Sequence, residues 1–184
     1  MTESEILEFL EGRSPLQKSR CPTLAFDTNA IFGARGGLDL IDTINLVNEH
    51  RGKAPRIFMV IPALVLHEKL RHMAQAHGDK FDPQMPLSVI RSKNLVVKGF
   101  GLPHAVQTAS RIQELFPSMA SFGDYKKRRC LQCLGLPEST STSGNGNKCG
   151  APVDWLIAGQ VELRGYLLVT SDTRSDMSNV RLSV

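Results

Sequence analysis

The segment from Leu24 to Ala30 constrains the fold of this chain most strongly, because three apolar residues lead directly into an acid. A short, continuously apolar run is typical of a strand that is buried on both faces of a parallel sheet. Asp27 then stands at the carboxyl end of that strand, and open α/β sheets bind ligands in the crevice outside the carboxyl ends of their strands. The segment therefore predicts an α/β fold with Asp27 at its functional edge.

The rest of the chain alternates apolar runs with segments of helical periodicity. We expect strands at residues 23–27, 56–61, 166–169 and 179–184, and either a strand or a short apolar connector at residues 94–100. We expect helices at residues 3–11, 38–50, 63–77, 87–92, 104–116 and 151–164. This alternation predicts a central parallel sheet with helices on both faces, which is a three-layer α/β/α architecture.

Length and charge place bounds on the class of protein. A chain of 184 residues fits one domain, spanning 1–184. Its apolar runs are shorter than the roughly 20 residues of a membrane-spanning helix, and its acidic start lacks the positive charge of a secretory signal. We therefore expect a cytoplasmic protein with no membrane partner and with reduced cysteines. The formal charge of +4 permits a polyanionic partner without requiring one.

Four carboxylates are expected to meet at the carboxyl edge of the sheet. Asp27 and Asp172 each follow an apolar strand, and Glu68 lies in the second turn of the helix after the second strand. Asp154 begins a crossover helix, which runs antiparallel to the strands and so starts at the same edge. Each acid by itself has a structural explanation, such as the preference for acids at helix starts. Their convergence from four segments favours a functional site.

The predicted cluster suits a divalent cation. Clustered carboxylates repel one another unless a cation lies between them. Oxygen ligands without histidine or cysteine favour Mg²⁺ or Mn²⁺ over zinc. Such a metal lowers the pKa of a bound water and neutralises charge that develops on a phosphoryl group. The predicted chemistry is metal-assisted hydrolysis of a phosphodiester.

Four segments resemble the motifs of PIN-domain nucleases, in the same order along the chain. They are Leu24–Asn29, Ile61–Glu68, Asp154–Ala158 and Leu168–Asp172. The resemblance implies a three-layer α/β fold and a Mg²⁺- or Mn²⁺-dependent ribonuclease that usually acts on single strands. Carried over position by position, it implies an acidic quartet of Asp27, Glu68, Asp154 and Asp172, with Asn29 and Thr170 as polar supports.

The resemblance also has departures and implied partners. Arg174 stands where the family often has a further acid, and Asp176, two residues on, is either a substitute metal ligand or a solvated residue. Many bacterial PIN proteins are VapC-type toxins that a cognate antitoxin holds inactive. The resemblance therefore implies RNA as substrate and an antitoxin as partner, and we also expect a homodimer.

Residues 124–150 are interpreted as an insertion that carries two candidate sites. Its basic run consists of Lys126, Lys127, Arg128 and Arg129. These cations either contact RNA phosphates or form a solvated face. Cys130, Cys133 and Cys149 have the spacing of three ligands of a structural zinc site. The fourth ligand would have to be Cys21, His104 or another histidine; the alternative is three reduced cysteines in a loop.

Three interpretations of function follow. The first is a metal-dependent endoribonuclease, either the toxin of a toxin–antitoxin pair or a housekeeping RNA-processing enzyme. The second is a PIN-like module that binds RNA or a protein partner without cleavage. The third is a haloacid-dehalogenase-like phosphatase, whose nucleophile is also an acid after the first strand. That family needs a second acid two residues on, where Asn29 stands, and the sequence therefore favours the nuclease.

Overall fold

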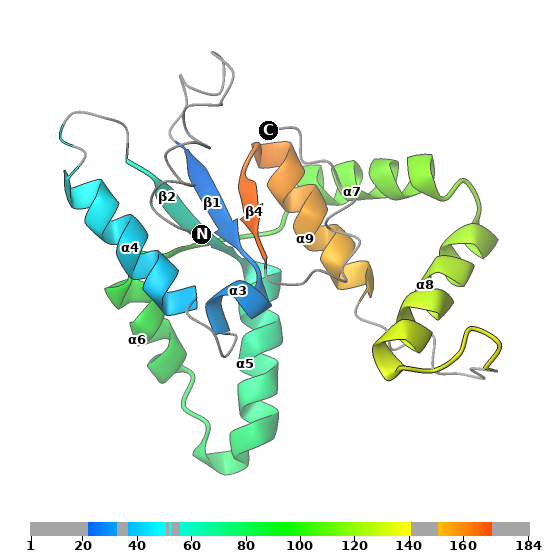
Figure 1. Ribbon diagram of the computed structural model, residues 1–184, viewed down its shortest axis with the longest axis horizontal. Coiled ribbons are helices and arrows are strands. Elements are labelled where there is room, and N and C mark those ends of the chain that lie inside the picture. Colours follow the sequence, from blue (N-terminus) through cyan, green and yellow to red (C-terminus); the bar gives the residue numbers. More distant parts are fainter. Residues whose placement is uncertain (1–21, 33–36, 51, 53–55, 141–150, 171–184) are drawn as a thin grey trace.

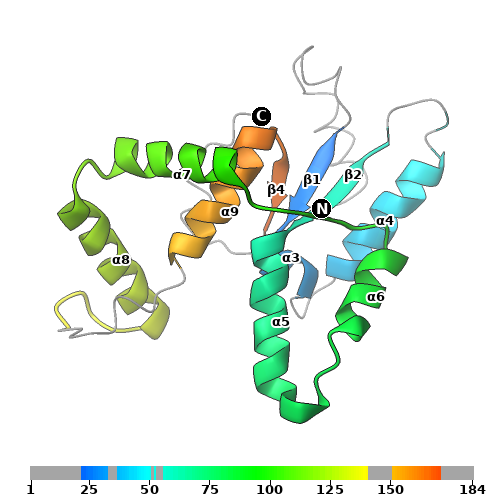
Figure 2. The same cartoon turned by 180° about the vertical axis from the view of Figure 1, so that it is seen from behind.

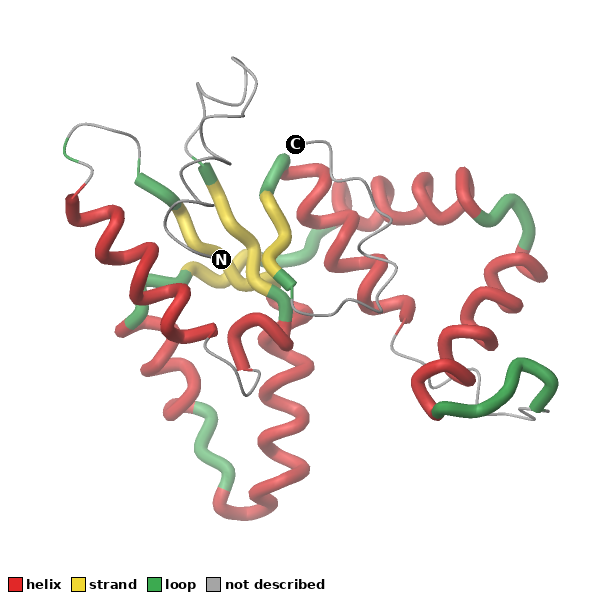
Figure 3. The backbone as a smooth tube through the Cα atoms, viewed as in Figure 1, coloured by secondary structure: helices red, strands yellow, loops and turns green. Residues whose placement is uncertain are grey.

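The central feature of the computed structural model is one parallel sheet. The structure describes residues 22–32, 37–50, 52, 56–140 and 151–170. The strands are β1 (Thr23–Phe26), β2 (Phe58–Pro62), β3 (Val96–Lys98) and β4 (Leu167–Val169). They are arranged in the order β3-β2-β1-β4, and every pairing is parallel. The predicted parallel sheet is confirmed, and Figure 3 shows its strands as one layer among helices.

Helices flank this sheet in a three-layer α/β/α arrangement, as predicted (Figure 1). They are α3 (Thr28–Phe32), α4 (Gly37–His50), α5 (Ala63–His77), α6 (Gln84–Ser92), α7 (Leu102–Leu115), α8 (Met119–Leu134) and α9 (Ala151–Arg164), with a 3₁₀ turn at Gly78–Lys80. Helix α9 packs against α7, α5 and α8. Figures 1 and 2 both show α7 and α8 reaching away from the sheet on the β4 side.

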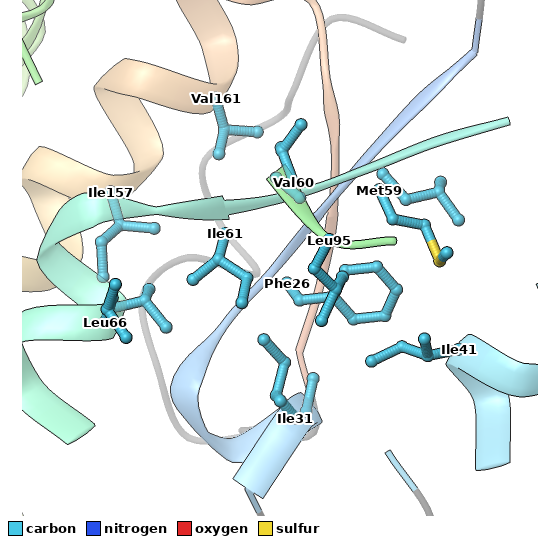
Figure 4. Packing of buried hydrophobic residues seen from close by; sticks show 14 of the residues in the cluster. Phe26, Ile31, Ile41, Met59, Val60, Ile61, Leu66, Leu95, Ile157 and Val161 are labelled. Carbon is cyan, nitrogen blue, oxygen red and sulfur yellow. The ribbon is translucent and has the colours of Figure 1, made fainter. Parts of the chain in front are cut away.

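Strand β1 is the central buried strand, with β2 on one side and β4 on the other. Leu24, Ala25 and Phe26 are all buried, which confirms the interpretation of the apolar run. Figure 4 shows Ile157 and Val161 of α9 on one side of the strands, with side chains of α3 and α4 on the other. Apolar contacts from both layers hold β1 in place, and Asp27 follows directly from it.

Helix α8 was not predicted: residues 119–134 form a regular helix, and its last part, from residue 124, belongs to the segment that we interpret as an insertion. Ser118 caps its start by accepting a hydrogen bond from the Ser121 amide at 3.1 Å. Gly135 ends it in the left-handed conformation (φ 66°), which favours glycine. The basic run obscured the apolar stripe on which Tyr125 and Leu131 are buried. Short helix α3 was also not predicted.

Several expectations lie outside the described residues. These are the helix at 3–11, the strand at 179–184 and most of the Ser/Thr/Gly/Asn-rich run at 138–148.

Within the described part of the chain, every helix is too short or too polar to cross a membrane.

Gln160 connects α9 to the end of β3 and is 1% exposed. Its Nε2 donates to the carbonyl oxygens of Lys98 at 2.9 Å and Gly99 at 3.0 Å. Within the described residues, its Oε1 has no hydrogen-bond partner. The buried amide of Gln160 therefore acts as a donor to two backbone carbonyl groups, a role that a carboxylate of the same shape cannot fill.

Replacing Gln160 by glutamate is expected to lower the free energy of unfolding by about 2–4 kcal/mol at pH 7, because it puts an acid against two carbonyl oxygens without a compensating donor. Urea unfolding followed by circular dichroism measures the loss. Gln113→Glu makes the same change on an exposed position of α7 and should shift stability by less than about 0.5 kcal/mol. Equal losses in the two variants would contradict the donor role of Gln160.

Candidate active site

Asp27 is held at the carboxyl edge of the sheet by its own backbone. Its amide donates to the carbonyl oxygen of Val169 at 3.0 Å, which extends the pairing of β1 with β4 by one residue. Its carbonyl oxygen accepts from the amides of Ala30 at 3.1 Å and Ile31 at 3.2 Å, at the start of α3. The residue is 5% exposed. Strand and helix together thus determine where the carboxyl group lies.

Each oxygen of the Asp27 carboxylate accepts a hydrogen bond. Oδ1 accepts from the amide of Thr28 at 2.7 Å. Oδ2 accepts from the hydroxyl of Thr170, just after β4, at 2.9 Å. Donors of this kind stabilise a buried carboxylate in its charged form. The structure therefore places Thr170, a support implied by the resemblance, directly against Asp27.

Glu68 is joined to this group through Thr28. The hydroxyl of Thr28 donates to Oε2 of Glu68 at 2.6 Å. Glu68 lies in the second turn of α5 and is half-buried. Helices α3 and α5 contact each other, so the short connection after β1 brings together two acids that are far apart in the sequence.

The other two members of the predicted quartet are placed differently. Asp154 is half-buried in the first turn of α9, whose amino end points to the side of the sheet where β1 and β4 end (Figures 1 and 2). Asp172 and Asp176 lie outside the described residues. Among the residues that are described, no three His, Cys, Asp or Glu side chains lie close enough to hold one ion. The meeting of all four acids stays a prediction.

The donor atoms around Asp27 suit a hard cation. Asp27 and Glu68 offer carboxylate oxygens, and Thr28 and Thr170 offer hydroxyl oxygens. Oxygen donors of this type are those that Mg²⁺ and Mn²⁺ prefer. A carboxylate oxygen has two lone pairs, so accepting a hydrogen bond is compatible with binding a metal. The described residues therefore fit part of a Mg²⁺ or Mn²⁺ site.

Sequence reasoning missed the role of Thr28. The resemblance implied Asn29 as a support, but Asn29 is exposed and takes no part in the hydrogen bonds that link Asp27, Thr28 and Glu68. A hydroxyl next to a strand-end acid is a local signal that could have suggested Thr28. Its partner on α5 is visible only in the folded chain.

The basic run lies on α8, and its four side chains differ in their surroundings. Lys127 and Arg128 are exposed. The ammonium of Lys126 lies 5.3 Å from the ring centroid of Phe122, and Arg129 donates to Oε1 of Gln132 at 3.1 Å. Lys127 and Arg128 are therefore the two members best placed for contact with a polyanion.

The predicted zinc ligands are only partly described. Cys130 and Cys133 lie one turn apart in α8 rather than in a loop, and Cys130 is buried. Cys149 and Cys21 lie outside the described residues. His104 is buried in α7, where its Nδ1 accepts from the Gly101 amide at 2.9 Å and its Nε2 lies 3.2 Å from Nε of Arg164. His104 is thus engaged within the fold, and a zinc site on α8 stays a prediction that needs another fourth ligand.

A groove of about 390 Å³ lies at the opposite edge of the sheet. It is lined by the last turns of α4 and by the first residues of β2 and β3, including Asn48, Arg56 and Phe58. The strands are parallel, so this amino edge is remote from Asp27. The groove is therefore separate from the acidic site.

Fold and site together define an α/β/α protein with hydrogen-bonded acids at the carboxyl edge of a parallel sheet. A solved structure with a similar fold is that of VapBC2 from Rickettsia felis bound to a DNA fragment from their promoter. The TM-score is 0.51 at 16% identity, covering 87% of this chain and 94% of that chain. No family model and no curated protein matches the sequence. The likeness shows the fold alone, a parallel sheet between layers of helices.

Proposed function

We propose that this protein is a divalent-metal-dependent endoribonuclease of the PIN type. The observation that carries the proposal is the link from Asp27 through Thr28 to Glu68 at the carboxyl edge of the sheet. This edge is where open α/β folds bind their ligands. The likeness in fold to a chain of a VapBC2 complex supports the same assignment.

The chain's own residues would prepare the site for hydrolysis. Asp27 and Glu68, with Asp154 and Asp172, are proposed to hold Mg²⁺ or Mn²⁺. When bound, the metal would supply an activated water and neutralise charge on the phosphoryl group. Thr170 and Thr28 hold the carboxyl group of Asp27 in one orientation. Hydrogen bonds to both oxygens favour the charged form of a carboxylate, which is the form that would bind the cation.

Cleavage of total cellular RNA tests the proposal. The pure protein is expected to cut RNA internally with Mg²⁺ or Mn²⁺ and to lose this activity in excess EDTA. Products are followed on denaturing gels with 5′-labelled RNA, so that internal cuts are distinguished from trimming at the ends. Binding of RNA without cleavage under any of these conditions would favour the non-catalytic PIN-like module.

We further propose that the exposed cations of α8 contact the RNA backbone. Changing Lys127 and Arg128 together to alanine is expected to weaken binding of single-stranded RNA for all sequences alike. Each lost phosphate contact reduces the slope of log K against log salt by about 0.7, so the pair should reduce it by about 1.4. Fluorescence anisotropy at several salt concentrations measures the slope.

The matched control for this prediction is Lys80→Ala with Arg91→Ala. Both of these side chains are exposed, on the turn after α5 and on α6, and their removal changes the net charge of the protein equally. The control should alter the slope much less than the α8 pair does. The same slope for both pairs would contradict a specific role for α8.

Toxin activity in the cytoplasm is the biological role that we propose for this nuclease. The support is the likeness in fold to a VapBC2 complex, and the implied partners are an antitoxin and a second copy of the chain. Induced expression in a bacterium should arrest growth only when the site is intact. Light scattering of the pure protein measures whether it is a dimer. Normal growth despite full expression of an active enzyme would favour an RNA-processing role instead.

A further inference from the structure

We infer that Thr28 is a positioning residue that holds Asp27 and Glu68 as one metal-binding unit. The inference rests on the proposed function, and it concerns a residue to which the resemblance assigns no role. It follows from two hydrogen bonds made by a single residue and from the elements that these bonds connect.

Thr28 donates to both acids at once. Its amide is 2.7 Å from Oδ1 of Asp27, and its hydroxyl is 2.6 Å from Oε2 of Glu68. Both distances fall in the range of charge-assisted hydrogen bonds. The amide is available because Thr28 is the first residue of α3, and the first amides of a helix have no partner within it. One residue therefore sets the positions of two carboxylates relative to each other.

The hydroxyl matters most for Glu68, whose long side chain is only half-buried. Asp27 is held by its backbone and by Thr170 as well, so it has other restraints. Two neighbouring carboxylates repel each other in the absence of a cation, and Glu68 is free to turn toward solvent unless a donor retains it. The stiff χ1 angle of threonine fixes the direction in which that donor points.

A comparison of Thr28→Val with Thr28→Ser tests the inference. Valine keeps the shape of the side chain and removes its hydroxyl donor, whereas serine keeps the hydroxyl. Both variants keep the backbone amide. Loss of an orienting partner of a metal ligand costs about 10–100-fold in metal affinity, so we expect Thr28→Val to raise the Kd for Mn²⁺ at least about tenfold. Thr28→Ser should stay within about threefold of the native protein. Calorimetric titration with Mn²⁺ measures binding directly, without reference to RNA cleavage.

A double-mutant cycle shows whether the effect acts through Glu68. In a Glu68→Gln background, Thr28→Val should cause little further loss of Mn²⁺ affinity, since the charged partner of the hydroxyl is already gone. Thr43→Val removes an exposed hydroxyl of α4 that donates to the Asp39 carbonyl oxygen, and it should leave the Kd unchanged. Thr28→Ala carries the same expectation as Thr28→Val if the valine variant does not fold.

Three outcomes would overturn the inference, and they show whether the proposed function fails with it. Native affinity for Mn²⁺ in both Thr28→Val and Thr28→Ala would reject the positioning role and leave the proposed nuclease standing. Fully additive effects of Thr28→Val and Glu68→Gln on Mn²⁺ affinity would also reject the positioning role, since Thr28 would then act independently of Glu68. No binding of Mn²⁺ by the native protein would reject the metal-dependent function and this inference together.

Discussion

Replacing Asp27 by asparagine is expected to lower the rate of Mn²⁺-dependent RNA cleavage at least about 100-fold, since even a partner of a metal ligand affects activity by 10–100-fold. The variant should still fold. The amide oxygen can accept from the Thr28 amide, and the amide nitrogen can donate to the Thr170 hydroxyl, which rotates to become an acceptor. The change therefore removes the charge that would hold the cation while preserving the hydrogen bonds that Asp27 now makes to these two residues.

Asp79→Asn is the matched control, because it makes the same chemical change at an exposed position in the turn that follows α5. It should cleave at the native rate. Both variants are purified identically, and thermal unfolding verifies that each is folded. Equal cleavage by the native protein and Asp27→Asn would contradict the catalytic assignment of Asp27, because the activity would then come from another site or from a contaminant.

Replacing Gly159 by alanine is expected to lower the free energy of unfolding by about 1–3 kcal/mol, the usual cost of forcing a methyl group into a packed core. Gly159 lies where α9 crosses α7. A Cβ there would lie 2.0 Å from Oγ1 and 3.2 Å from Cα of Thr108. Thr108 is buried, and its hydroxyl donates to the His104 carbonyl oxygen at 2.9 Å, so it has little room to move away.

Gly123→Ala on α8 is the control for this prediction, because a Cβ at that position meets nothing within 4 Å. Alanine should stabilise an open helical position by as much as about 1 kcal/mol. Adding Thr108→Ala to Gly159→Ala removes the closest contact, and part of the lost stability should return. Denaturant unfolding measures all of these variants. Equal denaturation midpoints for Gly159→Ala and Gly123→Ala would show that α7 and α9 do not pack as closely as described.

Local signals were enough for much of the architecture. Helix α5 occurs at residues 63–77, as predicted, because Pro62 precedes it and Gly78 ends it with a φ of 53°. Strand β1 was predictable because a short, continuous apolar run is typical of a strand that is covered on both faces. Each of these features depends on residues that are neighbours in the sequence, which is why pattern and spacing revealed them.

Features that depend on long-range partners were not predictable. The basic run hid helix α8, and the burial of Tyr125 depends on a distant partner, because Trp155 donates to its hydroxyl at 3.0 Å. The role of Gln160 depends on the carbonyl groups of Lys98, the last residue of β3, and of Gly99, about 60 residues away in the chain. Such contacts leave no periodic signal in the sequence.

The acidic site shows where the two kinds of information divide. The sequence by itself determined that Asp27 ends a buried strand and that Glu68 lies near the start of the helix after β2, because strand and helix patterns are local. Only the tertiary structure decided that Thr28 connects the two acids. The packing of α3 against α5 sets the contact between Thr28 and Glu68. The spacing of a residue from Asp27 in the sequence cannot reveal whether its side chain will face Glu68.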